Sequence, residues 1–558
     1  MDREAYRTRI MSEEFRDFIV PIEGGKEQFQ VPEFQRCAQS NVGQYEIVYI
    51  DKSQSEPLNF ERFTYNSIPR CFALLDMAAM NQSGISQVQN YPVLELMGQN
   101  VMIGFVDTGI DYRNDIFRNL DGTTRIAAIW DQTLQKGEMP NQFDYGSEYT
   151  KEQINEALRN EEPLKIVPSL DTNGHGTFLA SLASGSASPE NTFLGAAPES
   201  TLAVVKLKQA KQYIKRYYEI PEPAECYQEN DIMLAVNYVR NIALSMDMPI
   251  SLCMTLGTNG RSHDGASALS YVLDRFASGV GAVVSLSTGD EGNKQLHGTN
   301  VLKVPEVTGV LPNQGAIDSS WEYSLVEIRV DERQKGLFIN IWGSKPGVIS
   351  VGLVSPTGEV IERVAPRIGK SEIYNLIFDA TTVTIEYDLV EADSSDELII
   401  IRLENPTPGI WSLRIYDADE KYNVYLPVSQ FIYPNTYILE PSADITIVDP
   451  AVASNVITTS LYNARNGALY IDNGRGFGRD GSIKPDISSA LSCAITAGAA
   501  CQFLNWGIVE GKDKELRASD IKGYFIRGTI RANDISYPDR QWGYGKLDVY
   551  NSFEVIRG

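Results

Sequence analysis

The sequence predicts an α/β protein with a doubly wound parallel sheet, preceded by an N-terminal α+β unit and interrupted by an inserted all-β unit. Two observations support this. Apolar runs alternate with helical patterns through residues 99–322 and again through 436–558. Between them, residues 323–435 consist of short alternating segments separated by Gly, Pro, Asp and Asn. Residues 1–98 form the first unit, and we expect the two α/β segments to make one domain.

The N-terminal unit is the least patterned part of the chain. Residues Tyr45–Ile50 alternate as an exposed edge strand would. An apolar stretch follows from Phe72 to Met80, and the unit ends in Val93–Gly98. We predict a small α+β cap.

The α/β segments contain continuous apolar runs, which are typical of parallel strands buried on both faces. Amphipathic helical patterns lie between these runs, as expected for strand–helix–strand units. The expected strands are 101–106, 202–207, 250–254, 281–286 and 455–459, and the expected helices are 177–183, 231–243 and 266–276.

The inserted unit alternates with the period of half-buried strands, so we predict an all-β sandwich or jelly roll. Its expected strands are 325–330, 337–342, 348–354, 382–387, 398–403 and 411–416.

The composition of the chain argues against several kinds of partner, location and metal site. The formal net charge is −24, which argues against nucleic acid or an anionic membrane as a partner. No run of 18 apolar residues exists, and the N-terminus lacks the apolar core of a secretory signal, so we expect cytoplasmic synthesis. Six scattered cysteines suggest free buried thiols, and three histidines make a multi-histidine metal site improbable. We therefore predict no metal and no cofactor.

Two motifs carry chemistry. Asp107 stands at the end of an apolar run and is followed by Thr108 and Gly109. His175 lies between two glycines where a helical pattern begins. An Asp alone would more simply cap a turn. Together, however, the two residues match the carboxylate and the general base of a Ser-His-Asp triad.

At these residues the chain resembles the subtilisin-like serine proteases, peptidase family S8, and more narrowly their Csp branch in spore-forming clostridia and relatives. The order Asp, His, Ser along the chain is the order of that family. The resemblance implies a subtilisin-like fold, with the N-terminal unit as prodomain and the insert as jelly roll. It rests on Ile103–Tyr112, Thr172–Gly185, Gly195–Pro198, Leu256–Gly265, Gly289–Gly298, Lys484–Asp486 and Gln541–Gly545.

The resemblance also assigns site residues. It implies that Asp107 is the orienting carboxylate, that His175 is the general base, and that Thr255-Leu256-Gly257 binds substrate backbone. The family's oxyanion-binding Asn falls on Asp290. An ionised carboxylate offers no N–H and repels developing negative charge, and loss of one such donor costs roughly 10²–10³ in rate.

The nucleophile position falls on Ala490, counted back from the helix that carries Ala497-Gly498-Ala499. Truncating this serine in subtilisin, which belongs to the same family, costs roughly 10⁶ in turnover. The turn and loop expected after Asp486 are also missing, so we expect the chain to continue straight into the helix.

Three functions follow from these observations. The first is a catalytically inactive pseudoprotease that keeps its prodomain and binds a protein or peptide, such as a Csp-type protease, in spore germination. The second is an active serine endopeptidase that uses Ser488, Ser489 or Ser492 and cuts itself near Gln87 to Asn90. The third is a structural scaffold without a ligand.

Overall fold

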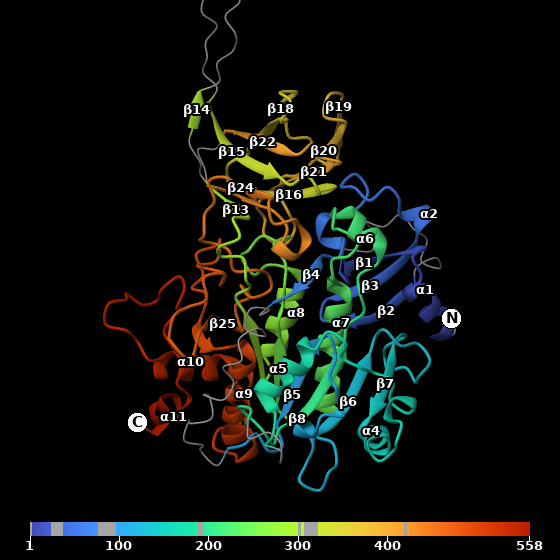
Figure 1. Ribbon diagram of the computed structural model, residues 1–558, viewed down its shortest axis with the longest axis vertical. Helices are drawn as coiled ribbons and strands as arrows, with labels where there is room; N and C mark the ends of the chain where they lie inside the picture. The colour runs from blue at the N-terminus through green and yellow to red at the C-terminus, as the bar shows by residue number, and fades with distance from the viewer. Residues whose placement is uncertain are drawn as a thin grey trace, which may run out of the picture.

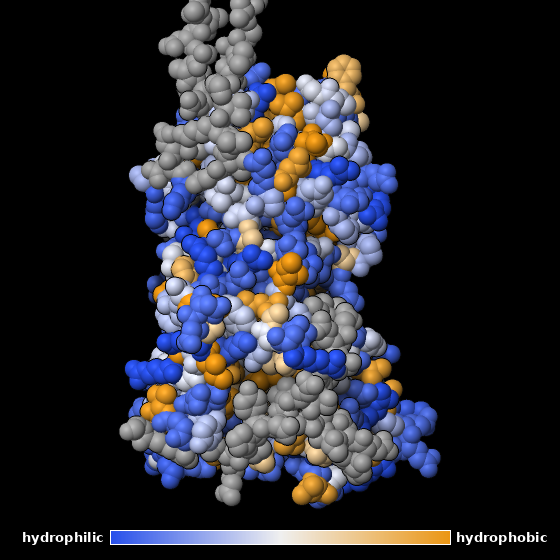
Figure 2. All heavy atoms as spheres, turned by 60° about the vertical axis from the view of Figure 1, so that its left-hand side comes forward, coloured by the Kyte–Doolittle hydropathy of each residue, from blue (hydrophilic) through white to orange (hydrophobic). Residues whose placement is uncertain are grey.

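The computed structural model describes residues 3–23, 37–75, 96–187, 194–299, 303–305, 322–417 and 421–557. An α/β body fills the lower part of the view in Figure 1, a β-sandwich lies above it, and the N-terminal unit packs at its right-hand side. Polar side chains cover most of the face in Figure 2, and apolar side chains are scattered among them in small groups. No helix in the ranges given above has the length and apolar character to cross a membrane.

Eight strands form the central sheet: β5 (Met102–Asp107), β6 (Ile126–Asp131), β7 (Ser147–Thr150), β8 (Thr201–Lys206), β10 (Ile250–Met254), β12 (Ala282–Ser287), β25 (Ile457–Tyr462) and β26 (Ile487–Ala490). Their order is β26-β25-β12-β10-β5-β8-β6-β7. Every neighbouring pair is parallel except β6 with β7. The five apolar runs predicted as strands are all in this sheet.

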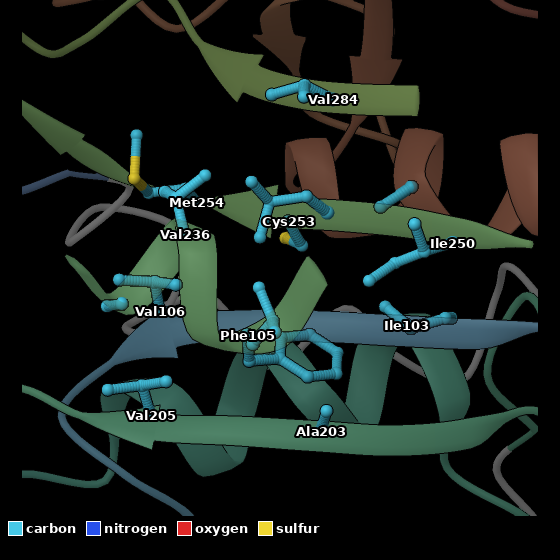
Figure 3. Close-up of a cluster of buried hydrophobic side chains, with 14 of the residues drawn as sticks. Ile103, Phe105, Val106, Ala203, Val205, Val236, Ile250, Cys253, Met254 and Val284 are labelled. Carbon is cyan, nitrogen blue, oxygen red and sulfur yellow. The ribbon is translucent and has the colours of Figure 1, made fainter. Parts of the chain in front are cut away.

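Two pairs of helices cover the sheet. The first pair is α5 (His175–Ser184) with α9 (Cys493–Leu504), and the second is α7 (Glu229–Ser245) with α8 (Ala268–Ala277). In Figure 3 the buried side chains of β5, β8, β10 and β12 lie against Val236 of α7. The other described helices of the body are α4 (Lys151–Leu158), α6 (Gln212–Tyr217), α10 (Ala518–Gly528) and α11 (Val549–Arg557). The body also contains the short 3-10 helices η5 (Asp115–Phe117) and η6 (Pro163–Lys165) and the π-helix η8 (Asn505–Val509).

The N-terminal unit is a three-stranded antiparallel sheet that packs on α7. It contains α1 (Arg3–Met11), β1 (Phe15–Pro21), β2 (Cys37–Val42), β3 (Tyr45–Asp51), α2 (Lys52–Ser55) and η3 (Tyr65–Ser67). The expectation of an exposed edge strand at Tyr45–Ile50 is wrong. This segment is the central strand β3, paired with β1 on one side and β2 on the other, and most of it is buried.

A second small sheet connects the N-terminal unit to the body. It consists of β4 (Cys71–Leu74), β9 (Tyr227–Gln228) and β11 (Leu256–Gly257), and β4 lies between the other two, antiparallel to both. The predicted apolar stretch from Phe72 to Met80 begins within β4. Its residues after Leu75 lie outside the described residues.

The insert is a sandwich of two antiparallel sheets whose inner faces share one apolar core. The first sheet has the order β13 (His297–Gly298), β23 (Tyr422–Tyr425), β16 (Gly336–Gly343), β21 (Glu397–Glu404), β20 (Thr381–Asp388), β19 (Ser371–Leu376). The second has β14 (Lys303–Pro305), β15 (Glu322–Val330), β22 (Gly409–Tyr416), β17 (Ser350–Val354), β18 (Val360–Val364), with β24 (Tyr437–Ile438) paired to β15 and η7 (Ser429–Phe431) nearby in sequence.

All six strands predicted for the insert are present, so the β-sandwich expectation agrees with the structure. The jelly-roll description and the four segment boundaries remain predictions. A further apolar cluster joins the sandwich to the rest of the chain, because Trp342 and Ile400 of the sandwich share it with Phe18 of β1 and Ile214 of α6. The N-terminal unit is thus packed against both other parts of the molecule.

Candidate functional site

The carboxyl edge of the central sheet brings three of the predicted residues together. Asp107 is the last residue of β5, and Thr255 directly follows the neighbouring parallel strand β10. His175 is the first residue of α5, which packs on β5. Ligands of open α/β sheets bind at this edge because loops of different strands converge there.

Asp107 and His175 form a fully buried pair. The Nδ1 atom of His175 lies 2.8 Å from Oδ1 of Asp107. The same carboxylate accepts the N–H of Thr108 at 2.7 Å and the hydroxyl of Thr255 at 3.2 Å. These donors fix the carboxylate toward the imidazole, as the orienting member of a triad requires.

The loop before α5 is held by a carboxylate that the sequence reasoning treated only as a flanking residue. Asp171 accepts the N–H of Gly174 at 2.8 Å and both the N–H and the hydroxyl of Thr177, at 2.9 and 2.6 Å. It thereby satisfies free donors in the first turn of α5. Gly176 permits close packing, since a Cβ there would lie 2.2 Å from the carbonyl oxygen of Gly109.

The predicted backbone-binding stretch pairs with a segment of this same chain. In the antiparallel pairing of β11 with β4, Leu256 stands opposite Leu74 and Gly257 opposite Ala73. The N–H of Leu75 donates to the carbonyl of Thr255 at 2.8 Å. Residues 71–75 thus pair with the predicted backbone-binding stretch as an added β-strand, the way an extended peptide binds a sheet edge.

Leu75 is the last residue of this added strand, residues 71–75, which we call the groove strand. Its carbonyl oxygen lies 2.7 Å from Nε2 of His175, and its side chain is buried. This contact was not predicted. The self-cleavage site of an active enzyme was expected near Gln87 to Asn90, which lies outside the described residues. Pairing between distant segments left no local signal; only the apolar character of the strand indicated burial.

The loop that carries the predicted oxyanion position supports the groove strand. Asp290 is half-buried in the turn after β12, at the same sheet edge. Its neighbour Glu291 is fully buried and accepts the N–H and hydroxyl of Ser429 at 3.1 and 3.0 Å. Burial raises the pKa of Glu291 to about 7. Gln430, which follows Ser429 in the sequence, donates to the carbonyl of Leu74 at 3.2 Å.

Ala490 lies at the end of β26, so the expectation that the chain enters the helix directly after Asp486 is wrong. Residues 487–490 instead pair in parallel with β25. Leu491 then turns the chain with φ of +69°, and α9 follows. Three strands separate β26 from β5, so β26 is displaced from β5 by four interstrand spacings, a lateral distance of roughly 19 Å.

The three alternative serines have other local roles. The hydroxyl of Ser488 bonds to that of Ser460 at 2.6 Å and to the carbonyl of Trp542 at 3.1 Å. Ser492 caps α9 by accepting the N–H of Ala494. Ser489 is buried, and its hydroxyl has no hydrogen-bond partner among the described residues.

Buried charges fasten the N-terminal unit to the body. Asp17 of β1 is fully buried and lies 2.6 Å from Nζ of Lys211. Its other oxygen accepts from Gln228 at 3.1 Å and Asn230 at 3.3 Å. Burial lowers the pKa of Lys211. A buried carboxylate with these donors provides a specific connection between the two units.

Metal binding has no support in the described part of the chain. Within it, no group of three or more His, Cys, Asp or Glu side chains is arranged to hold an ion. The absence of a metal or cofactor remains a prediction from the sequence.

Comparisons with known proteins agree with this geometry. Residues 98–362 match the subtilase family, Peptidase S8. A subtilisin-like protease of Arabidopsis thaliana, SBT3.3, is 26% identical over 218 residues, which span 35% of this chain and only 26% of that relative. The structure of the Clostridium perfringens CspB protease is 23% identical with a TM-score of 0.72, and the match covers 85% of this chain and 96% of that one. The chain therefore has a subtilisin-like fold, and residues 98–362 contain a match to a subtilase family domain.

Proposed function

We propose that this protein is a pseudoprotease: a subtilase-fold protein that binds an extended peptide in its groove and does not cleave it. The observation that carries the proposal is the groove strand. Residues 71–75 pair with the stretch predicted to bind substrate backbone, and Leu75 ends against His175. The protein thus binds a peptide in the manner of a protease, and the bound peptide is its own N-terminal region.

The replacement of the serine at the predicted nucleophile position supports the proposal. Ala490 has no hydroxyl, and three strands separate β26 from β5. Asp290 replaces the amide donor with a carboxylate. Each change removes a separate contribution to acyl transfer, which needs both a nucleophile and oxyanion stabilisation.

An active serine endopeptidase is the second candidate, and Ser489 is the observation in its favour. This hydroxyl is buried and unpartnered among the described residues. It lies on the opposite face of β26 from Ser488 and Ala490, because side chains alternate along a strand. A covalent serine probe distinguishes the two candidates, since only an activated serine reacts.

The partner is proposed on chemical grounds as a protein segment that can replace the groove strand. That segment would be extended and apolar, with a leucine at the position of Leu75. The resemblance to the Csp branch suggests spore germination as the setting and a Csp-type protease as the partner.

The test uses the full chain with its groove strand weakened by Leu74→Asp and Leu75→Asp together. A labelled peptide with the sequence of residues 70–75 should bind this variant more tightly than it binds the unmodified protein, and it should remain intact. The matched control is the same peptide methylated on the amide nitrogen of its last residue, which cannot donate to Thr255. Equal binding of the two peptides, or hydrolysis of either, would contradict the proposal. Circular dichroism should confirm that the variant is folded.

A further inference from the structure

The imidazole ring of His175 has an oxygen atom next to each of its two nitrogens. His175 is fully buried, with Nδ1 at 2.8 Å from a carboxylate oxygen of Asp107 and Nε2 at 2.7 Å from the carbonyl oxygen of Leu75. A carbonyl oxygen can only accept a hydrogen bond, and an ionised carboxylate can only accept one. Both ring nitrogens therefore need a proton to make these contacts.

A neutral imidazole cannot satisfy both contacts, because one of its nitrogens carries a lone pair instead of a proton. The proton cannot be placed on Asp107 without cost. Each of its oxygens already accepts a hydrogen bond, one from the N–H of Thr108 and the other from the hydroxyl of Thr255. The arrangement that satisfies every group is an imidazolium between a carboxylate and a carbonyl.

We propose that His175 is held as an imidazolium and that it serves as the binding group for the main-chain carbonyl of the peptide in the groove. This gives the retained dyad a role that needs no serine. The inference deepens the proposed function and rests on it. A general base must start the reaction neutral, whereas an imidazole that donates to a carbonyl and a carboxylate at the same time must be charged.

The charged groups around His175 favour a cation. Asp107 belongs to β5, and Asp171 on the loop before α5 accepts the hydroxyl of Thr108 at 2.9 Å. Tyr227 of β9 also faces Asp107, and burial together with that carboxylate raises the pKa of its phenol. Asp290 lies at the same sheet edge. The cation nearby, Lys206 of β8, donates to the carbonyl of Leu170 at 2.6 Å.

Deprotonation should weaken the groove contact. When pH rises and Nε2 loses its proton, a lone pair faces the carbonyl oxygen, and a charge-assisted hydrogen bond becomes a repulsive contact. A peptide in the groove should therefore bind more weakly at high pH than at neutral pH.

Nitrogen NMR of the full chain labelled with ¹⁵N-histidine tests the inference without any activity. The chain has three histidines. Burial lowers the pKa of His263 to about 3 and also lowers the pKa of His297, so both should be neutral at pH 7. We expect one histidine with both nitrogens protonated at pH 7, and its signals should disappear in His175→Gln. If that variant does not fold, Asp107→Asn should instead convert the same histidine to a neutral one.

Peptide binding across pH 5 to 9 supplies the second readout, using the variant with the weakened groove strand. Affinity should fall at least tenfold as His175 deprotonates. His175→Gln in that background should show no such dependence, since its amide can donate to the carbonyl at every pH. A neutral His175 at pH 7 overturns this inference and leaves the proposed function standing. Absence of peptide binding at every pH overturns the proposed function, while the NMR result still decides the protonation of His175.

Discussion

The two halves of the carboxyl edge of the sheet differ in which residues of a serine protease site they retain. Around β5 and β10, the dyad and the backbone-binding stretch are in place and hold a strand. Around β12 and β26, the predicted oxyanion position is Asp290 and the predicted nucleophile position is Ala490, at the end of an edge strand. Under the proposed function, the first half binds a peptide and the second half no longer breaks its bond.

The largest expected effect is on turnover, which should lie at least roughly 10⁶ below that of an intact subtilase. Ala490→Ser should not recover it, because the new hydroxyl would end β26 at a lateral distance of roughly 19 Å from Asp107. Hydrolysis of a fluorogenic peptide measures this, with Ser489→Ala as the matched control. Activity gained on introducing the serine would remove the contrast between the two halves.

Asp17→Asn tests how firmly the N-terminal unit is fastened beside the intact half. The change leaves Lys211 buried without its counter-charge, so the free energy of unfolding should fall by about 3 kcal/mol or more. Denaturant unfolding at neutral pH measures the loss. A loss below about 1 kcal/mol would show that this buried pair does not fasten the unit.

Glu291→Gln tests the link between the degenerate loop and the groove strand. The pKa of Glu291 is raised from 4.5 to about 7, so its stabilising contribution is full below pH 4.5 and is lost as pH rises through 7. The raised pKa of Glu291 corresponds to a contribution of roughly 3 kcal/mol to the free energy of unfolding. The variant should therefore lose less stability than the unmodified protein between pH 4.5 and 8. Parallel stability profiles for the two proteins would exclude this role for Glu291.

The smallest effect is expected for Asp144→Asn, the matched comparison for Asp17→Asn. Asp144 also joins the N-terminal unit to the body, through Arg3 at 2.9 Å, but Arg3 is 46% exposed. An exposed pair contributes about 0–1 kcal/mol because water and salt screen it. A loss in denaturant unfolding as large as that of Asp17→Asn would mean that burial does not decide the strength of these connections.

Local signals in the sequence located much of the fold and predicted two residues that the structure brings into contact. Continuous apolar runs predicted the buried strands β5, β8, β10, β12 and β25, because both faces of those strands are covered. Asp107 and His175 were found because each stands in a short motif beside a strand end or a helix start. Their pairing at 2.8 Å follows from the order of the sheet and the packing of α5.

The remaining features depend on contacts between distant segments. Nothing near Leu75 indicates that its N–H meets Thr255 or that its carbonyl meets His175, residues 180 and 100 positions away. The missing loop after Asp486 did not reveal that the chain would add a strand to the sheet before α9 begins. The central place of β3 likewise depends on which strands pair with it.

The most direct test of the central claim is the intact mass of the purified protein before and after treatment with a fluorophosphonate probe. The account predicts one species at the mass of the full chain, 62.0 kDa, with no adduct. A species that lacks the N-terminal region through Leu75 or beyond, and that carries one adduct, would show that the protein cuts itself with an activated serine. That result would contradict a pseudoprotease whose groove holds its own uncleaved strand.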